Sequence, residues 1–190
     1  MRVIGGKFRS RSLLAPAGLD TRPTSDRLRE TLFNVLTQGA VNWVTGAAFL
    51  DLYAGSAAVG IEALSRGAGS VTFVEQGAAA LEVLQKNLDG LGLRGALVRV
   101  EKKSVGRFLR GAAEKAGFGV VFLDPPYEMA EEYETTLGLL GSDSVGLLAP
   151  GAVVVAEHRR KSGLEGSYGK LVRTRVLEQG DAGLSFYSIE

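Results

Sequence analysis

The sequence has no cysteine and a single histidine among its 190 residues. Disulfides and thiolate metal sites are therefore excluded, and a zinc centre is not expected. No apolar run approaches the roughly 20 residues that a membrane helix needs, and the N-terminus lacks the apolar core of a signal peptide. We therefore predict a cytoplasmic protein with no membrane segment and no metal site.

Net charge is also small, since 22 basic residues against 21 acidic ones leave a formal charge of only +1. The distribution is uneven, because the first 30 residues carry seven basic and three acidic side chains, a net charge of +4. The rest of the chain therefore sums to about −3. A basic arm on a mildly acidic body is typical of a phosphate-binding extension, although a solvated basic tail gives the same pattern.

Apolar segments of strand length alternate with amphipathic segments of helix length from about residue 47 onward, which predicts an α/β fold with a mostly parallel sheet. The expected strands are 48–53, 70–75, 96–100, 120–124 and 152–157. The expected helices are 25–36, 58–67, 78–89, 104–115 and 130–141, the first capped by Thr24 or Ser25. Residues 170–190 predict an antiparallel hairpin that turns at Gly180–Gly183, and 161–169 predicts a loop.

A hydrophobic content of 45% in 190 residues suits one globular domain with a real core. We expect residues 41–190 to form this domain. Residues 1–40 are expected to form a basic N-terminal extension and helix.

A glycine-containing turn, Asp51–Gly60, follows the first predicted strand and leads straight into a helix. Open parallel sheets bind ligands at such a turn, because the backbone there approaches the ligand closely. Ala57 breaks the three-glycine dinucleotide fingerprint, and the Lys-Ser or Lys-Thr pair of a P-loop is missing. Glu75, at the end of the second strand, is placed to accept hydrogen bonds from two ribose hydroxyls. The alternative is a tight turn with packing glycines and a solvated glutamate.

The most informative segment is Asp124–Tyr127, which reads Asp-Pro-Pro-Tyr directly after the fourth apolar strand. The exocyclic amine of a nucleobase is a poor nucleophile because its lone pair is delocalised, so an enzyme must orient it. Asp124 and the carbonyl of Pro125 are suited to accept its two N–H groups, while Pro126 stiffens the loop. Tyr127 offers a face for an extruded base during in-line methyl transfer from a sulfonium. The structural alternative is a proline-stiffened turn with a capping aspartate.

A series of motifs makes the sequence similar to the bacterial 16S ribosomal RNA guanine-N2 methyltransferases over almost the whole chain. These motifs are Arg2–Lys7 with Arg9, Arg11 and Leu13, then Arg22–Thr24, Asp26–Arg27, Arg29–Asn34, Asp51–Ser56, Gly60–Ala68, Glu75, Asn87–Leu88 and Asp124–Tyr127. Asp124–Tyr127 is also found in DNA amino-methyltransferases. Its combination with the Arg-Pro-Thr segment, Arg22–Thr24, makes the ribosomal RNA family the closer resemblance.

The resemblance implies a Rossmann-like class I methyltransferase that depends on S-adenosylmethionine, with a mostly parallel seven-stranded sheet, a C-terminal antiparallel hairpin and a small N-terminal extension. It implies methyl transfer to the exocyclic N2 amine of a guanine in 16S rRNA, within the small ribosomal subunit or an assembly intermediate. We expect the enzyme to act as a monomer.

The resemblance also assigns residues to roles. The cofactor-binding residues that it implies are Asp51, Tyr53, Ala54, Gly55, Ser56, Gly60, Glu75, Ser104 and Asp124. The catalytic residues are Asp124, Pro125, Pro126 and Tyr127. The residues expected to bind RNA are Arg2, Lys7, Arg9, Arg11, Arg22, Thr24, Arg27 and Arg29. Arg27 and Arg29 have an alternative role as surface partners of Asp26 and Glu30.

Three positions depart from the family pattern and bear on cofactor affinity. Ala57 replaces a usual glycine, and Gln76 stands where an acidic residue often follows Glu75. Lys103–Val105 lacks the aspartate that commonly binds the adenine amine, which leaves Ser104 or a backbone group for that contact.

Two other functions stay open. A DNA adenine or cytosine amino-methyltransferase also acts on an extruded amine, but the chain has no obvious target-recognition insertion. A noncatalytic RNA-binding assembly factor would not need the intact Asp124–Tyr127 loop. His158–Lys161 is either a second basic patch or a charged loop, with His158 expected at the surface.

Overall fold

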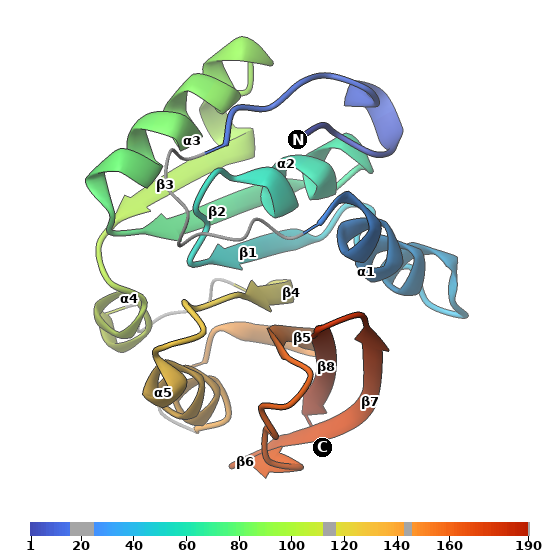
Figure 1. Ribbon diagram of the computed structural model, residues 1–190, viewed down its shortest axis with the longest axis vertical. Coiled ribbons are helices and arrows are strands. Elements are labelled where there is room, and N and C mark those ends of the chain that lie inside the picture. Colours follow the sequence, from blue (N-terminus) through green and yellow to red (C-terminus); the bar gives the residue numbers. More distant parts are fainter. Residues whose placement is uncertain (16–24, 112–116, 143–145, 190) are drawn as a thin grey trace.

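A computed structural model describes residues 1–15, 25–111, 117–142 and 146–189 (Figure 1). The strands are β1 (Ala48–Leu52), β2 (Ser70–Glu75), β3 (Val98–Lys102), β4 (Phe118–Leu123), β5 (Leu148–Arg159), β6 (Ser167–Tyr168), β7 (Leu171–Gln179) and β8 (Ala182–Ile189). The helices are α1 (Asp26–Gln38), α2 (Ala58–Ser65), α3 (Ala78–Gly90), α4 (Val105–Gly111) and α5 (Ala130–Leu140), with short 3₁₀ turns η1 (Gly6–Phe8) and η2 (Gly95–Leu97). Among these described helices, none is long and apolar enough to cross a membrane.

The strands form one sheet in the order β3-β2-β1-β4-β5-β8-β7-β6. Strands β1 to β5 pair in parallel, whereas β8 pairs antiparallel to both β5 and β7. The chain runs outward from β1 to β3 and then returns to place β4 on the other side of β1. Open α/β sheets bind their ligands at the carboxyl ends of the strands on either side of such a reversal, which here are β1 and β4.

The predicted fold class, a mostly parallel sheet that ends in an antiparallel hairpin, is confirmed. The described sheet has eight strands rather than seven because Ser167–Tyr168 pairs with β7 inside the segment expected to be a loop. The third strand begins two residues later than expected, since Gly95–Leu97 forms a 3₁₀ turn. The helix expected at 104–115 is described for Val105–Gly111, and residues 112–116 lie outside the described residues.

Side chains alternate along the central strands and pack into two hydrophobic clusters, one on each face of the sheet. Phe49 packs with residues of α1, α2 and α3, whereas Leu50 packs with residues of α4 and α5. Figure 1 shows α4 and α5 on one side of the sheet and α1 on the other. Helix α1 begins where expected, because the side chain of Ser25 accepts a hydrogen bond from the Leu28 amide at 3.1 Å.

The N-terminal segment is tied to α2 by the buried carboxylate of Glu62. Its two oxygens accept the backbone amides of Ile4 at 2.7 Å and Gly5 at 2.8 Å, and Arg66 donates to it at 2.7 Å. Arg29 of α1 lies 3.8 Å from the same carboxylate, and both side chains are fully buried. Because a buried charge needs a partner of opposite sign, this contact fixes α1, α2 and the N-terminal segment relative to one another.

We expect Glu62→Gln to lower the free energy of unfolding by about 3 kcal/mol, because Arg29 loses its buried carboxylate and a single amide oxygen replaces two acceptors. Urea titration followed by circular dichroism measures the change. Glu82→Gln is the control, since Glu82 is exposed on α3 and pairs with Lys86 at the surface. An unchanged unfolding midpoint in the Glu62 variant would contradict this role.

Candidate active site at the carboxyl ends of the strands

The turn between β1 and α2 has an unusual backbone. Tyr53, Gly55 and Ala57 all have positive φ angles, of 59°, 52° and 67°. This left-handed region is open to glycine but costs other L-residues about 1 kcal/mol or more. The turn is therefore held in place by its surroundings, and Ala57, which replaces a usual glycine, adopts the conformation that glycine would adopt freely.

Glu75 at the end of β2 holds this turn from one side. One of its carboxylate oxygens accepts the amide of Gly55 at 2.9 Å, and the other accepts the amides of Gln76 at 2.8 Å and Gly77 at 2.7 Å. A carboxylate offers about four lone-pair positions, so these three bonds leave acceptor capacity for a ligand hydroxyl. Glu75 thus shapes the turn in addition to its predicted role toward a ribose.

Asp51 and Gly60 lie beneath the turn and bind each other. The carboxylate of Asp51 accepts the amide of Gly60 at 2.8 Å, and only 2% of Asp51 is exposed. The pKa of Asp51 is raised to about 8, mainly by burial; the hydrogen bond from Gly60 opposes this shift, and the nearby charge of Glu75 adds a smaller rise. A Cβ on Gly60 would lie 2.3 Å from Phe73, so glycine here allows α2 to pack on β2.

The other predicted cofactor residues surround the same turn. The hydroxyl of Tyr53 donates to Glu132 of α5 at 2.7 Å, so its side chain points toward the opposite face of the sheet. The amide of Ala54 donates to the carbonyl of Val74 at 3.1 Å. Ser56 is buried, and its carbonyl accepts the side-chain amide of Asn87 at 2.9 Å.

Asn87 and Ser104 show two further links around the site. The side chain of Asn87 also pairs with both backbone groups of Leu14, so it joins the N-terminal segment to the turn between β1 and α2. Ser104 lies just before α4, where its hydroxyl accepts the amide of Arg107 at 3.4 Å. The predicted contact of Ser104 with an adenine therefore competes with its local role at the start of α4.

The Asp124–Tyr127 loop leaves the sheet between β1 and β5. Leu123 is the register partner of both Leu52 and Ala156, so the next residue, Asp124, lies at the switch point of the sheet. Burial, followed by the charges of Glu157 and Asp51, raises the pKa of Asp124 well above its ordinary value. Carboxyl groups whose pKa is shifted by desolvation and by specific neighbouring charges are frequent at functional sites.

Both proline carbonyls of the loop lie close to a hydrogen-bond donor. The amide of Met129 donates to the carbonyl of Pro126 at 2.8 Å, which closes a turn. The hydroxyl of Tyr133 lies 3.5 Å from the carbonyl of Pro125 but donates at 2.9 Å to the backbone carbonyl of Glu157. The shorter bond dominates, so the carbonyl of Pro125 keeps acceptor capacity for a substrate amine.

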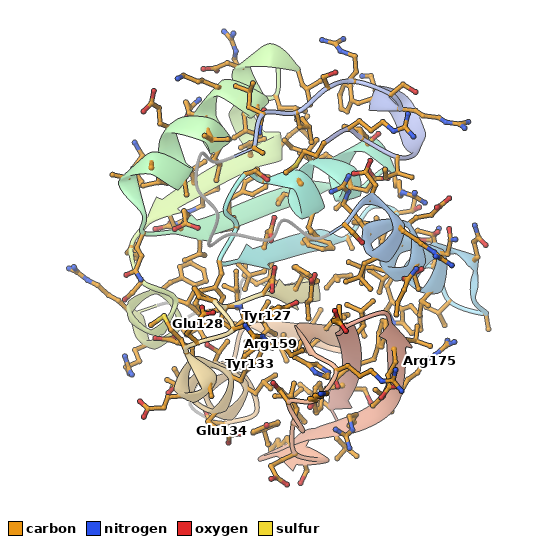
Figure 2. All side chains as sticks on the ribbon, in the orientation of Figure 1. Tyr127, Glu128, Tyr133, Glu134, Arg159 and Arg175 are labelled. Carbon is orange, nitrogen blue, oxygen red and sulfur yellow. The ribbon has the colours of Figure 1, made fainter. Side chains whose placement is uncertain are left out.

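Glu157 was not assigned a role from the sequence, and Arg159 was considered there only as part of a basic patch. Glu157 at the end of β5 is 3% exposed, and its carboxylate accepts the hydroxyl of Tyr127 at 3.4 Å. Arg159 places its guanidinium 5.2 Å from the ring centre of Tyr127 and 3.5 Å from Glu128. Figure 2 shows Tyr127, Glu128 and Arg159 close to Tyr133. The signal in the sequence was an acidic residue that ends an otherwise apolar strand.

The expectation that His158 lies at the surface is wrong, since only 4% of this residue is exposed. Its ring nitrogens contact the carbonyl of Arg159 at 2.8 Å and the hydroxyl of Ser185 at 2.9 Å. Burial lowers the pKa of His158, so the neutral form is favoured. The basic patch expected at 158–161 is therefore limited to Arg159, Arg160 and Lys161, which are exposed.

The predicted RNA-binding residues fall into three groups. Arg22 and Thr24 lie outside the described residues. The exposed members are Arg2, Lys7, Arg9, Arg11 and Arg27. Arg29 is fully buried, donating to Asp26 at 2.8 Å and to the carbonyl of Arg2 at 2.5 Å. The structure thus contradicts a phosphate contact for Arg29 and supports the alternative pairing with Asp26, although within the protein rather than at its surface.

Comparison with known proteins adds to this geometry. A family model described as "Conserved hypothetical protein 95" matches residues 1–188. The chain is 39% identical over 164 residues to the Ribosomal RNA small subunit methyltransferase D of Escherichia coli (strain K12), covering 86% of this chain and 77% of that protein. It is 38% identical over 188 residues to YlbH of Bacillus subtilis (strain 168), covering 98% of each.

Solved structures give the same picture. The structure of yhhF from Escherichia coli has a TM-score of 0.84 and 35% identity, and the match covers 100% of this chain and 98% of that chain. SMU.776, solved as a complex with SAH, has a TM-score of 0.60 at 15% identity, covering 95% of this chain and 52% of that chain. The second likeness concerns the fold alone.

The raised pKa of Asp51 makes stability depend on pH. The folded chain keeps a proton up to about pH 8 that the unfolded chain releases above about pH 4. The contribution of this proton to stability is therefore complete below pH 4 and declines as pH rises toward 8. Asp51→Asn keeps an oxygen for Gly60 but does not titrate, so we expect it to flatten this decline and to be more stable than the parent at pH 8.

Urea unfolding of the protein without cofactor at several values between pH 4 and pH 8 measures the effect. At pH 8 we expect the Asp51 variant to have a higher free energy of unfolding than the parent, by roughly 1.4 kcal/mol for each unit by which folding raises the pKa of Asp51. Asp89→Asn, at an exposed position of α3, is the control. Parallel pH profiles for the Asp51 variant and the parent would refute the assignment of the buried proton to Asp51.

Proposed function

The chain belongs to the family described as Conserved hypothetical protein 95, a family of small-subunit ribosomal RNA methyltransferases, and from this premise we propose its reaction. The protein transfers a methyl group from S-adenosylmethionine to the exocyclic N2 amine of a guanine in 16S rRNA. The class I methyltransferase fold expected from the sequence is confirmed, and it supports this proposal.

The observation that carries the proposal is the position of Asp124–Tyr127. The loop follows β4 directly and lies next to the turn of β1, so the proposed amine acceptors and the turn that would receive the cofactor lie at the same edge of the sheet. A proline-stiffened turn with a capping aspartate would not need an aspartate whose pKa is raised by desolvation and by two neighbouring carboxylates. The combination favours a catalytic loop over a purely structural one.

The turn fits an S-adenosyl cofactor. A Cβ built on Gly55 would meet only the carbonyl of Tyr53, at 3.9 Å, so the backbone is open to a ligand there. Glu75 keeps acceptor capacity for ribose hydroxyls, and the acidic strand ends suit a cationic sulfonium. SMU.776, which binds SAH, shares the fold and supports this cofactor. When bound, the cofactor supplies an electrophilic methyl group.

The protein's own groups then orient the acceptor. Asp124 accepts one N–H of the guanine amine and the carbonyl of Pro125 accepts the other, which directs the nitrogen lone pair out of the base plane. The ring of Tyr127 stacks on the extruded base. If the nitrogen took the methyl group from the sulfonium and the thioether left, the amine would become acidic, and the Asp124 carboxylate would take its proton.

RNA recognition is assigned to the N-terminal part, residues 1–40, with residues 41–190 as the methyltransferase domain. Arg2, Lys7, Arg9, Arg11 and Arg27 are exposed and suited to bind phosphates. Arg159 to Lys161, beside the catalytic loop, extend the basic surface. The substrate is 16S rRNA in the small subunit or an assembly intermediate, and the enzyme acts in the cytoplasm as a monomer.

Tritiated S-adenosylmethionine, incubated with the protein and small subunits from cells that lack the activity, tests the proposal. After nuclease digestion, we expect the label in N2-methylguanosine of 16S rRNA.

Asp124→Ala is expected to abolish transfer while leaving cofactor affinity nearly unchanged, because Asp124 faces the amine. Glu75→Ala is expected to weaken cofactor binding in calorimetry, since it removes the ribose acceptor and the brace of the turn. Full methyl transfer by the Asp124 variant would contradict the catalytic role assigned to Asp124.

A role for the N-terminal part in RNA binding is testable at Arg27. Arg27 is exposed on α1, so Arg27→Glu is expected to weaken binding to small subunits and to reduce the salt slope by about 1 to 2. Filter binding at several salt concentrations measures both quantities. Arg110→Glu, at an exposed position of α4, carries the same charge change on another face and serves as the control. An equal loss of affinity for small subunits in the Arg27 and Arg110 variants would argue against a specific role of Arg27.

A further inference from the structure

Glu157 stands directly beside the catalytic aspartate. Leu123 of β4 and Ala156 of β5 are register partners, so the residues that follow them, Asp124 and Glu157, lie side by side at the strand ends. Side chains alternate along a strand, which puts the Glu157 carboxylate on the sheet face occupied by Val155 and Phe122. The charge of Glu157 acts on Asp124, in agreement with this closeness.

Two tyrosines of the site hold Glu157 in place. The hydroxyl of Tyr127 donates to its carboxylate at 3.4 Å, and that of Tyr133 donates to its backbone carbonyl at 2.9 Å. Tyr127 is also the residue whose ring is proposed to stack on the base. A base on that ring, with its amine at Asp124, therefore brings its neighbouring edge atoms toward Glu157.

The hydrogen-bonding edges of the bases differ next to the amine. Guanine has a ring N–H donor, N1–H, beside its N2 amine, so two donors lie together. Adenine and cytosine have an unprotonated ring nitrogen beside their amines, which is an acceptor. An ionised carboxylate is an acceptor only, so a second carboxylate next to Asp124 matches guanine and opposes the other two bases.

We propose that Glu157 accepts the N1–H of the target base and so selects guanine over bases with a ring acceptor beside the amine. This inference rests on the proposed function, because it names the base-selecting contact of the same site. A buried acceptor that faces another acceptor leaves both unsatisfied, and for a charged group this mismatch reduces kcat/KM by about 100-fold.

The test uses small subunits assembled with 16S rRNA that is ligated to carry either guanine or 2-aminopurine at the nucleotide labelled by the parent enzyme. 2-Aminopurine keeps the amine at the same ring position but has an acceptor at N1. We expect the parent to prefer guanine by about 100-fold in kcat/KM. In Glu157→Gln, the amide can donate to N1 of 2-aminopurine, so the preference is expected to fall at least about tenfold.

Glu128→Gln is the matched control, since it removes an exposed carboxylate next to Tyr127 and is expected to keep the parent's preference. Equal use of both bases by the parent would overturn the inference even if the Glu157 variant failed to fold. An unchanged preference in a folded Glu157→Gln that binds S-adenosylmethionine would also overturn it and would assign both donors to Asp124. Failure of the parent to label guanine at N2 would instead count against the proposed function.

Discussion

The buried carboxylate of Glu62 is the contact on which the arrangement of the N-terminal half depends. It accepts two backbone amides of the N-terminal segment and faces Arg29 of α1 and Arg66, which directly follows α2. Once this segment is in place, Leu14 reaches Asn87, whose side chain also holds the carbonyl of the cofactor turn. A charge far from the reacting atoms thus links the N-terminal segment to the turn that would receive the cofactor.

At the active site, the main feature is the gathering of carboxylates at the ends of neighbouring strands. Asp51 and Glu157 lie near the carboxyl ends of β1 and β5, and Asp124 directly follows β4 between them; desolvation together with neighbouring charge raises the pKa of Asp51 and Asp124. Such an arrangement costs stability in the absence of ligand, because like charges repel in a buried place. It matches a reaction in which a cationic cofactor and an amine proton both meet these groups.

Basic residues that look alike in the sequence have different roles. Arg27 is exposed, whereas Arg29, two residues later, turns inward and is fully buried. Arg159 leaves the end of β5 toward the ring of Tyr127, while His158 before it is buried against Ser185. Helical and strand periodicity decide these orientations, so the basic surface is smaller than the count of basic residues suggests.

The sequence by itself determined the strand–helix order, the cap at Ser25 and the position of the Asp124–Tyr127 loop at a strand end. These features are local, since apolar spacing and turn residues act over a few positions. The partners of Arg29, the burial of His158 and the pairing of Glu157 with Asp124 were decided only by the tertiary structure. The strand order places β4 beside β1 and β8 beside β5, and the spacing of residues along a chain does not reveal which distant strand ends become neighbours.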